Sequence, residues 1–449
     1  MRAMSSARFP HPLALLTGCI LAAAVCSYIL PAGQYLRHED PAAGRQVVVA
    51  GTYHRVEPAH VGPFQAMVAI PKGLADAASV VFFVFLVGGA FTVVDETGAL
   101  RQAVEWLVLR LQRREALVIP IVSLAFAAGG ALENMSEEII ALVPVLILVT
   151  RRLGFDAVTA VAMSLGAAGV GAAFSPINPF QVQIAQKLAG VPLLSGAAFR
   201  LVFLSLALAL WIAATWRHAL RTRQASESLE ITAPAGLDAR GTAVLVLVIA
   251  TFVLFVYGVM RLGWDFDQMA ALFFAMGLIS GVIGGLGIGR TAGAFVTGFT
   301  AMANAAMLIG FARAIFVVLD QGRVIDTIVN ALVTPLQNLP VALSALGMLG
   351  VQALVHGPVP SVSGQAVLTM PVLVPMSDLI GLSRQVVVLA YQYGAGLTDL
   401  ITPTNGALMA VTAAAGVKYG DWLAFAVPVY AGLLVLGGIG IVLGIWGGY

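Results

Sequence analysis

The chain has 449 residues, of which 59% are hydrophobic and 10% charged, whereas about 25% of the residues in an ordinary soluble domain are charged. This composition excludes a soluble globular protein. Apolar runs of about twenty residues, the length that crosses the hydrocarbon core of a bilayer, predict an all-α polytopic membrane protein. The formal net charge is +2 and the sequence has no dense basic tract, so we expect no nucleic-acid partner.

The first apolar run, from Leu13 to Leu30, follows two arginines and has the appearance of a secretory signal. No convincing small-residue cleavage site precedes Pro31, so we expect a retained first helix with the N-terminus in the cytoplasm. Cys19 and Cys26 lie in this run, about 10 Å apart along a helix, which is too far for a disulfide. Residues 31–63 are polar and predict an ordered loop outside the membrane.

An apolar span at 77–94 precedes a segment, 101–114, in which apolar residues recur at helical spacing among four arginines. This pattern predicts an interfacial helix on the cytoplasmic side. Residues 116–150 then have two apolar arms around a charged, glycine-containing centre. Because that centre could not lie in lipid as part of a continuous span, we expect a re-entrant helical hairpin.

A helix expected at 156–188 must break where Pro176 and Pro179 remove backbone donors. Residues 218–240 are the one long polar linker, expected in the cytoplasm, and 241–265 hold a linking helix. The other expected elements are helices at 201–216, 269–288 and 303–319, an amphipathic stretch at 323–338, a second hairpin at 341–379, a second broken helix at 384–412, interrupted at 402–406, and a last helix at 422–445.

An internal repeat relates the two halves of the chain. A shift of 227 residues aligns 136–180 with 363–407 without a gap and gives ten identities in 45 positions, and helix breakers and polar residues fall together. We therefore expect a first repeat at 1–217 and a second at 266–449. Because the linking helix at 241–265 has no counterpart in the first half, the second repeat would be inverted. Inverted repeats with broken helices are the architecture of secondary transporters with alternating access.

Four motifs mark the hairpins and breaks, namely Glu133–Glu138, Ser361–Gln365, Ser175–Pro179 and Thr402–Gly406. They resemble those of the anaerobic C4-dicarboxylate carrier family of the ion transporter superfamily. The segments 9–14, 51–57 and 381–385 look like those of its basic amino-acid antiporter branch. The resemblance implies an elevator-type homodimer, in which a fixed scaffold carries the dimer interface and a mobile domain holds the hairpins and broken helices.

The same resemblance implies a coupling cation between each hairpin tip and its paired break. Sodium-coupled relatives carry Ser-Asn-Thr at the tips, whereas this chain carries Asn-Met-Ser and Ser-Val-Ser, so sodium and proton coupling both stay open. Side-chain oxygens suit a hard cation. The predicted cation ligands are Asn134, Ser136, Ser175, Asn178, Ser361, Ser363, Thr402 and Asn405. The alternative is that these side chains bond the backbone freed at a proline kink.

The predicted substrate-binding residues are Asn178, Asn405, Thr404, Arg313, Glu138 and Asp399. Arg313 falls in the middle of the span at 303–319, where a charge must face protein or a cavity. It could bind a substrate carboxylate, or it could pair with Asp399 or Glu138. His356 is interpreted as a turn or interface histidine.

Acids crowd the centre of the first hairpin, and they are Glu133, Glu137 and Glu138. If they line the cavity, the predicted site carries more negative than positive charge. An amine-bearing carboxylate would bind such a site more easily than a dianion would.

These patterns predict an ion-coupled secondary active transporter of small carboxylate-bearing metabolites in the inner membrane, with amino acids first and C4-dicarboxylates as the alternative. A channel is the remoter alternative, because re-entrant loops also build pores. We expect no enzyme activity and no cofactor, since the sequence lacks a His-Glu-x-x-His motif and a convincing nucleophile pair. The glycine-rich run from Gly281 to Gly289 lies inside a predicted span and indicates close helix packing rather than phosphate binding.

Overall fold

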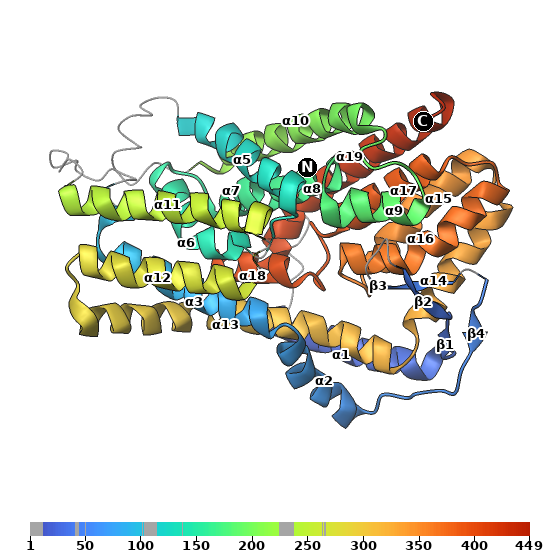
Figure 1. The fold of residues 1–449 in the computed structure, drawn as a ribbon, viewed down its shortest axis with the longest axis horizontal. Helices are drawn as coiled ribbons and strands as arrows, with labels where there is room; N and C mark the ends of the chain where they lie inside the picture. Colours follow the sequence, from blue (N-terminus) through green and yellow to red (C-terminus); the bar gives the residue numbers. More distant parts are fainter. Residues whose placement is uncertain are drawn as a thin grey trace.

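The computed structural model describes residues 12–40, 45–49, 51–100, 102, 115–136, 138–223, 238–262, 264 and 266–449. Helices dominate the chain, and many of them run along one common direction (Figure 1). Within the described ranges, six helices are long and apolar enough to cross a membrane. The prediction of an all-α polytopic membrane protein is therefore confirmed.

The first half contains helices of very different lengths. They are α1 (Pro12–Ile29), α2 (Pro63–Asp76), α3 (Ala78–Glu96), η1 (Glu115–Leu117), α5 (Val118–Glu133), α6 (Glu138–Arg152), α7 (Ala157–Val161), η2 (Ala162–Gly166), α8 (Ala167–Ala173), η3 (Pro179–Gln183), α9 (Ile184–Ala189) and α10 (Ala197–Thr222). The segments η2 and η3 are π-helical turns. Such turns are rare inside α-helices and are frequent at functional sites.

The second half begins after residues 224–237, which fall within the predicted linker and lie outside the described ranges. Its helices are α11 (Ala239–Leu262), α12 (Phe266–Ile283), α13 (Gly287–Gln321), α14 (Ile325–Val333), η4 (Thr334–Asn338), α15 (Val341–His356), α16 (Val362–Leu379), α17 (Arg384–Thr398), α18 (Gly406–Ala414) and α19 (Tyr419–Trp446).

Two helical hairpins stand where the sequence has polar centres between apolar arms. In the first, α5 ends at Asn134, whose φ of 56° turns the chain before α6 begins. In the second, Ser361 caps α16 by accepting a hydrogen bond from the Gly364 amide at 3.3 Å. The α5–α6 hairpin lies towards the left of Figure 1 and the α15–α16 hairpin towards the right. The two hairpins therefore lie towards opposite ends of the molecule in this view.

Each hairpin packs against a broken helix. The helix α5 contacts α8, while α15 and α16 contact α17. The first break follows Ala173, and the second spans residues 399–405 between α17 and α18. A second group of contacts joins α13 to α1, α2 and α3, and α3 to α12, and α13 also contacts α18 of the second broken helix. The hairpins and broken helices thus pack together, beside a group built around the 35-residue helix α13.

Two buried tryptophans donate hydrogen bonds to backbone carbonyl groups of the broken helices. Trp211 on α10 donates through Nε1 to the Ala162 carbonyl in η2 at 2.8 Å. Trp422 on α19 donates through Nε1 to the Leu400 carbonyl in the second break, also at 2.8 Å. Both indoles are fully buried. Trp422 thereby satisfies a carbonyl group of the break that would be costly to leave unpaired in a nonpolar environment, whereas the Ala162 carbonyl also accepts from the Ala167 amide.

The structure corrects the interpretation of the glycine-rich run. The span predicted at 269–288 ends at Ile283, and residues 284–286 turn the chain into α13. Gly285 and Gly287 have φ values of 72° and 74°, a left-handed conformation that residues with a Cβ rarely adopt. The run therefore contains a helix–helix turn and is not the interior of one span.

Three further segments differ from the predictions or lie outside the described ranges. Residues 31–63 contain two small antiparallel sheets, in which β1 (Gly33–Gln34) pairs with β4 (His54–Arg55) and β2 (Arg37–Asp40) pairs with β3 (Arg45–Val48). Except for Gln102, the interfacial helix predicted at 101–114 lies outside the described residues. The helix α2 follows these sheets and was not predicted, because Pro71 and Lys72 interrupt its apolar pattern.

Close packing of α5 on α8 gives the first fold prediction. A Cβ atom on Gly171 would lie 2.2 Å from the Ala127 carbonyl oxygen, so Gly171→Ala must separate the two helices. We expect this variant to lower the free energy of unfolding by about 1–3 kcal/mol, measured as a lower thermal midpoint in detergent. The control is Gly293→Ala in α13, where a Cβ meets nothing within 4 Å. Equal midpoints for both variants would contradict the packing.

Asp156 gives a pH-dependent prediction. Its carboxylate caps α7 by accepting from the Thr159 amide at 2.9 Å, and it bonds His218 Nε2 at 2.9 Å. Burial raises the pKa of Asp156, but the hydrogen bonds from His218 and Thr159 outweigh burial and lower the pKa from 3.8 to about 2. Because the pKa of the folded state is depressed, Asp156 stabilises the fold above pH 3.8, and this stabilisation is lost as the pH falls towards 2.

We therefore expect Asp156→Asn to lower the free energy of unfolding at pH 7 by about 1 kcal/mol, after allowance for the partial exposure of the carboxylate. The difference in thermal midpoint between this variant and the wild type should narrow as the pH falls through the range from 3.8 to about 2. A difference that stays constant down to the lowest pH measured would contradict the assignment.

Candidate functional site

The first break is held against the end of α5 by two buried polar side chains. Ser175 Oγ donates to the Ala131 carbonyl at 2.7 Å and accepts from the Asn178 amide at 2.9 Å. Asn178 Nδ2 donates to the Gly130 carbonyl at 2.8 Å. Asn178 Oδ1 accepts from the backbone amides of Phe180 and Gln181, both at 2.9 Å. In this state both side chains bond carbonyl groups at the end of α5 and backbone amides in the break.

Gln181 belongs to this cluster, although it is not one of the cation ligands predicted from the sequence. Its Nε2 donates to Asn134 Oδ1 at the hairpin tip at 2.8 Å. Its Oε1 is buried and has no partner among the described residues. The spacing of three residues from Asn178 was the available signal, because residues i and i+3 share one helical face. Gln181 thus adds an acceptor oxygen to the predicted pair of tip and break.

The other predicted residues of the first hairpin are only partly described. Ser136 Oγ donates to the Asn134 carbonyl at 3.3 Å. Glu137 lies outside the described residues, as do the side chains of Glu133 and Glu138. The acid cluster predicted for this hairpin therefore stays a prediction.

The second break carries a hydrogen-bonded histidine–aspartate pair. His356 is fully buried at the end of α15, and its Nε2 lies 2.7 Å from Asp399 Oδ1. Asn405 Nδ2 donates to the same oxygen, and Asn405 Oδ1 caps α18 by accepting from the Leu408 amide at 2.9 Å. His356 and Asn405 thus share one carboxylate oxygen of Asp399, so the predicted residues Asp399 and Asn405 are in direct contact. It also corrects the interpretation of His356, which is a member of this polar cluster.

A glutamine network continues from His356 between the arms of the second hairpin. His356 Nδ1 lies 2.8 Å from Gln365 Oε1 on α16. Gln365 Nε2 donates to the Gln352 carbonyl at 2.7 Å, and Gln352 Nε2 donates to Thr369 Oγ1 at 2.8 Å. Gln352 and His356 are four residues apart on one arm, as Gln365 and Thr369 are on the other. That spacing on both arms was the signal that could have found the network.

Two threonines of the second break lie against the turn of the second hairpin. Thr404 Oγ1 donates to the Gly357 carbonyl at 2.7 Å, and it lies 2.8 Å from Thr402 Oγ1. Ser363 lies in the first turn of α16, next to the capping residue Ser361. The predicted residues Asp399, Thr402, Thr404 and Asn405 therefore come together at the second break, whereas Ser361 bonds the first turn of α16.

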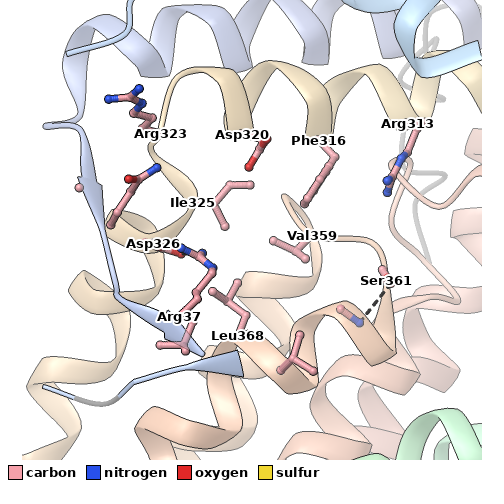
Figure 2. A pocket seen from close by; sticks show the side chains of 15 residues that line it. Arg37, Arg313, Phe316, Asp320, Arg323, Ile325, Asp326, Val359, Ser361 and Leu368 are labelled. Carbon is pink, nitrogen blue, oxygen red and sulfur yellow. Dashed lines mark hydrogen bonds and ion pairs between the residues drawn. The ribbon is translucent and has the colours of Figure 1, made fainter. Parts of the chain in front are cut away.

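Arg313 lies on a cavity of about 380 Å³ at the tip of the second hairpin (Figure 2). This cavity is bounded by β1, the ends of β2 and β3, the C-terminal part of α13, α14 and α16. Its lining residues are Gly33, Gln34, Arg37, Val48, Arg313, Phe316, Asp320, Arg323, Ile325, Asp326, Val359, Ser361, Gly364, Val367 and Leu368. Two residues predicted separately, Arg313 for substrate and Ser361 for a cation, thus share one cavity. It is called the tip cavity below.

The partner of Arg313 differs from one predicted alternative. Its Nε lies 3.6 Å from Asp76 Oδ2, and its guanidinium lies 4.8 Å from the centre of the Phe316 ring. Pairing with Asp399 is wrong for this state, because Asp399 bonds His356 and Asn405. The Arg313 side chain is 42% exposed, which leaves it accessible from the tip cavity.

Charges of both signs line the tip cavity. Arg37 forms an ion pair with Asp326 at 2.8 Å, and Asp326 also accepts from the Tyr35 amide at 2.9 Å, so β2 is anchored to α14. Asp320 and Arg323 are exposed and form no ion pair with the described part of the chain. The cavity therefore offers an anionic and a cationic group that form no contact ion pair in the described structure, although Arg37 and Arg313 are close enough to attract the Asp320 carboxylate.

A family comparison identifies the chain. The family model of the C4-dicarboxylate anaerobic carriers, DcuC, matches residues 9–446. The chain belongs to the DcuC family. The chain is 33% identical over 404 residues to the Escherichia coli (strain K12) protein named "Putative basic amino acid antiporter YfcC", a match covering 83% of this chain and 80% of that protein. It is 31% identical over 417 residues to an uncharacterised protein of Haemophilus influenzae, covering 89% and 82%.

Solved structures give a weaker likeness to this DcuC family member. The YdaH transporter of Alcanivorax borkumensis has 18% sequence identity and a TM-score of 0.45, covering 98% of this chain and 99% of that chain. MtrF of Neisseria gonorrhoeae, from a class of antimetabolite efflux pumps, has 16% identity and a TM-score of 0.40, covering 98% and 96%.

The resemblance inferred from the hairpin and break motifs is confirmed by the family match. The DcuC assignment and the apolar helices together make the chain a multi-pass membrane protein of a transporter family.

Proposed function

We propose that this DcuC family member is an ion-coupled secondary active transporter that carries small carboxylate-bearing metabolites by an elevator mechanism. Amino acids are the favoured substrates. The family match supports transport, and the two hairpins packed on two broken helices support a carrier rather than a channel. The wider proposal is a homodimer in the inner membrane, with the N-terminus in the cytoplasm and the fixed scaffold formed around α13.

Two related units at opposite ends of the molecule support alternating access. The gap-free repeat relates 136–180 to 363–407, and the hairpins that contain the start of each segment lie at opposite ends in Figure 1. We propose that the units are inverted in the membrane. Each hairpin would then control access from one side while the substrate stays between the two breaks.

The tip cavity is the observation that carries the substrate proposal. An amino acid has a carboxylate and an amine, and the cavity offers Arg313 and Arg323 for the first and Asp320 for the second. In the proposal the substrate enters here and then meets the polar groups of the breaks. Those proposed substrate-binding residues are Asn178, Asn405, Thr404, Glu138 and Asp399. The printed name of the Escherichia coli relative agrees with an amine-bearing substrate.

The oxygen-rich tips and breaks support a hard coupling cation, either sodium or the proton. The buried Gln181 Oε1, which has no partner in the described structure, is an acceptor that a cation could satisfy. At the second break, the hydroxyl groups of Thr402 and Thr404 and the side chains of Ser361 and Ser363 supply further oxygens. We propose that the predicted cation ligands act together with Gln181, with the ion replacing some of the backbone hydrogen bonds seen in this state.

C4-dicarboxylate transport is the second candidate function. The family description favours it, and so do the three arginines of the tip cavity. Two of these, Arg313 and Arg37, already face Asp76 and Asp326. A dianion would therefore need coupling cations to offset the remaining acids, as the sequence analysis also indicated.

Uptake into proteoliposomes tests the proposal. We would measure uptake of labelled arginine and labelled succinate under inward sodium or proton gradients, each in competition with unlabelled arginine, ornithine, succinate and fumarate. The amino-acid proposal expects saturable uptake of arginine, inhibition by ornithine, and faster uptake when the vesicles are preloaded with arginine. Strong inhibition by succinate and fumarate alone would establish the dicarboxylate function. Flux without saturation or counter-substrate stimulation would favour a channel.

A cavity variant makes the test specific to the proposed site. Asp320→Asn should raise the KM for arginine, because it removes the group proposed to bind the amine. The KM for succinate should stay unchanged or fall. The matched control is Asp378→Asn, since Asp378 is an exposed acid that pairs with Arg384 at 2.7 Å and does not line the tip cavity.

A further inference from the structure

A buried arginine is connected to the first break by hydrogen bonds. It belongs neither to the tip cavity nor to the predicted site residues. Arg200, in the first turn of α10, is fully buried. It forms no ion pair with any described residue. Its position near the N-terminus of a helix, the positive end of the helix dipole, is unfavourable for a cation. A charge placed at such cost requires an explanation beyond packing.

The partners of Arg200 are neutral acceptors from three separate segments. Arg200 Nη1 donates to the Ser195 carbonyl and to Tyr449 Oη, both at 2.8 Å. Its Nη2 donates to Gln385 Oε1 at 3.3 Å, and its Nε donates to Gln392 Oε1 at 3.0 Å. The last of these bonds is the one that leads to the break.

Gln392 forms hydrogen bonds both to Arg200 and to the first break. It is fully buried in α17, and its Nε2 donates to the Ser175 carbonyl at 2.7 Å. The neighbouring residue Tyr393 packs its ring on Phe174, with the ring centres 4.4 Å apart. Two consecutive residues of α17 therefore hold the residues that follow α8. The Ser175 carbonyl lies at the C-terminal, negative end of α8, where a positively polarised donor is favourable.

We propose that Arg200 is a positioning residue for the first break, acting through Gln392. The guanidinium makes a charge-assisted hydrogen bond to Gln392 Oε1, which fixes the amide and strengthens donation from Nε2. That donor holds the Ser175 carbonyl in place. It thereby sets the turn in which Ser175 and Asn178 bond the end of α5. The consequence for transport rests on the proposed function, whereas the consequence for the shape of the break does not.

Hydrogen exchange of the purified full-length protein measures the shape of the break directly. The reporters are the amides of Ile177, Asn178, Phe180 and Gln181, whose acceptors are Ser175 Oγ and Asn178 Oδ1. Arg200→Met should raise their exchange rates roughly tenfold or more, because hydrogen bonds to charged groups are stronger than neutral ones. A peptide spanning 174–183 reports on all four.

Gln392→Glu separates the relay from simple anchoring. Glutamate at position 392 keeps an acceptor for Arg200 but replaces the donor to the Ser175 carbonyl with an oxygen. The proposal expects this variant to increase exchange at 174–183 as much as Arg200→Met does. If Arg200 only anchors α10 to α17, Gln392→Glu leaves the break unchanged, and that result overturns the proposal even if Arg200→Met does not fold.

Tyr449→Phe is the matched control, because it removes a partner of Arg200 that does not lead to the break. It should raise exchange near 190–200 and leave 174–183 unchanged, and equal opening of the break would overturn the relay. In the uptake assay, Arg200→Met and Gln392→Glu should raise the KM at least about fivefold and keep Vmax within about twofold. If the wild type takes up neither arginine nor succinate, the proposed function fails, while the exchange result still decides the role of Arg200.

Discussion

Replacement of Asp399 by alanine is expected to reduce ion-coupled uptake at least about a hundredfold. Asp399 bonds the fully buried His356 at 2.7 Å and also accepts from Asn405. Without the carboxylate, His356 and Asn405 lose a common partner at the start of the second break. Removing one partner of a buried, charge-assisted pair costs about 3–5 kcal/mol. Uptake by proteoliposomes with equal amounts of reconstituted protein measures the effect.

The matched control for this variant is Asp378→Ala. Asp378 also forms a salt bridge, with Arg384 at 2.7 Å, but both side chains are 44% exposed. Exposed pairs contribute little, about 0–1 kcal/mol, so uptake should stay within about twofold of the wild type. Normal uptake by Asp399→Ala, or an equal loss in both variants, would contradict a special role for the second break.

Asn178→Ala is expected to lose uptake and also to lower the stability of the protein. The side chain donates to Gly130 and accepts from the amides of Phe180 and Gln181. Its removal leaves the amides of Phe180 and Gln181 without an acceptor, whereas the Gly130 carbonyl keeps its bond from the Asn134 amide. At about 1 kcal/mol or more for each unsatisfied group, the free energy of unfolding should fall by roughly 2 kcal/mol. Thermal unfolding in detergent, followed alongside uptake, measures both effects.

Asn405→Ala is the comparison at the corresponding position of the second repeat. Asn405 caps α18 through one backbone amide and bonds the Asp399 side chain. Loss of a helix cap costs about 1 kcal/mol. The stability loss should therefore be smaller than for Asn178→Ala, whereas the loss of uptake should be comparable. Unchanged stability in Asn178→Ala would show that its backbone bonds do not hold the break.

The positions of the hairpins and breaks could be predicted from the sequence because each has a local cause. Proline removes backbone donors at 176 and 179, and polar residues cannot occupy the centre of a span in lipid. The small sheets between α1 and α2 had no such signal, because strands of two to four residues carry almost no pattern. The turn at 284–286 depends on the φ values of Gly285 and Gly287, which composition does not reveal.

The membership of the site was only partly predictable. Asn178 and Asn405 stand out through the repeat, and the structure places each at its break. The pairing of His356 with Asp399 joins residues 43 positions apart and depends on how α15 packs on α17. Arg313 could be recognised as a functional candidate from its depth in a span, but its contact with Asp76 required the packing of α2 on α13.

The central claim is that the two units of hairpin and broken helix face opposite sides of the membrane. Cysteine labelling tests it most directly, in a protein with Cys19 and Cys26 replaced by serine. Arg151, at the end of α6, and Arg384, at the start of α17, are both exposed. A membrane-impermeant maleimide should label Arg151→Cys from one side of sealed vesicles and Arg384→Cys from the other, with both labelled after permeabilisation. Labelling of both positions from the same side would contradict the inverted arrangement and, with it, alternating access between these units.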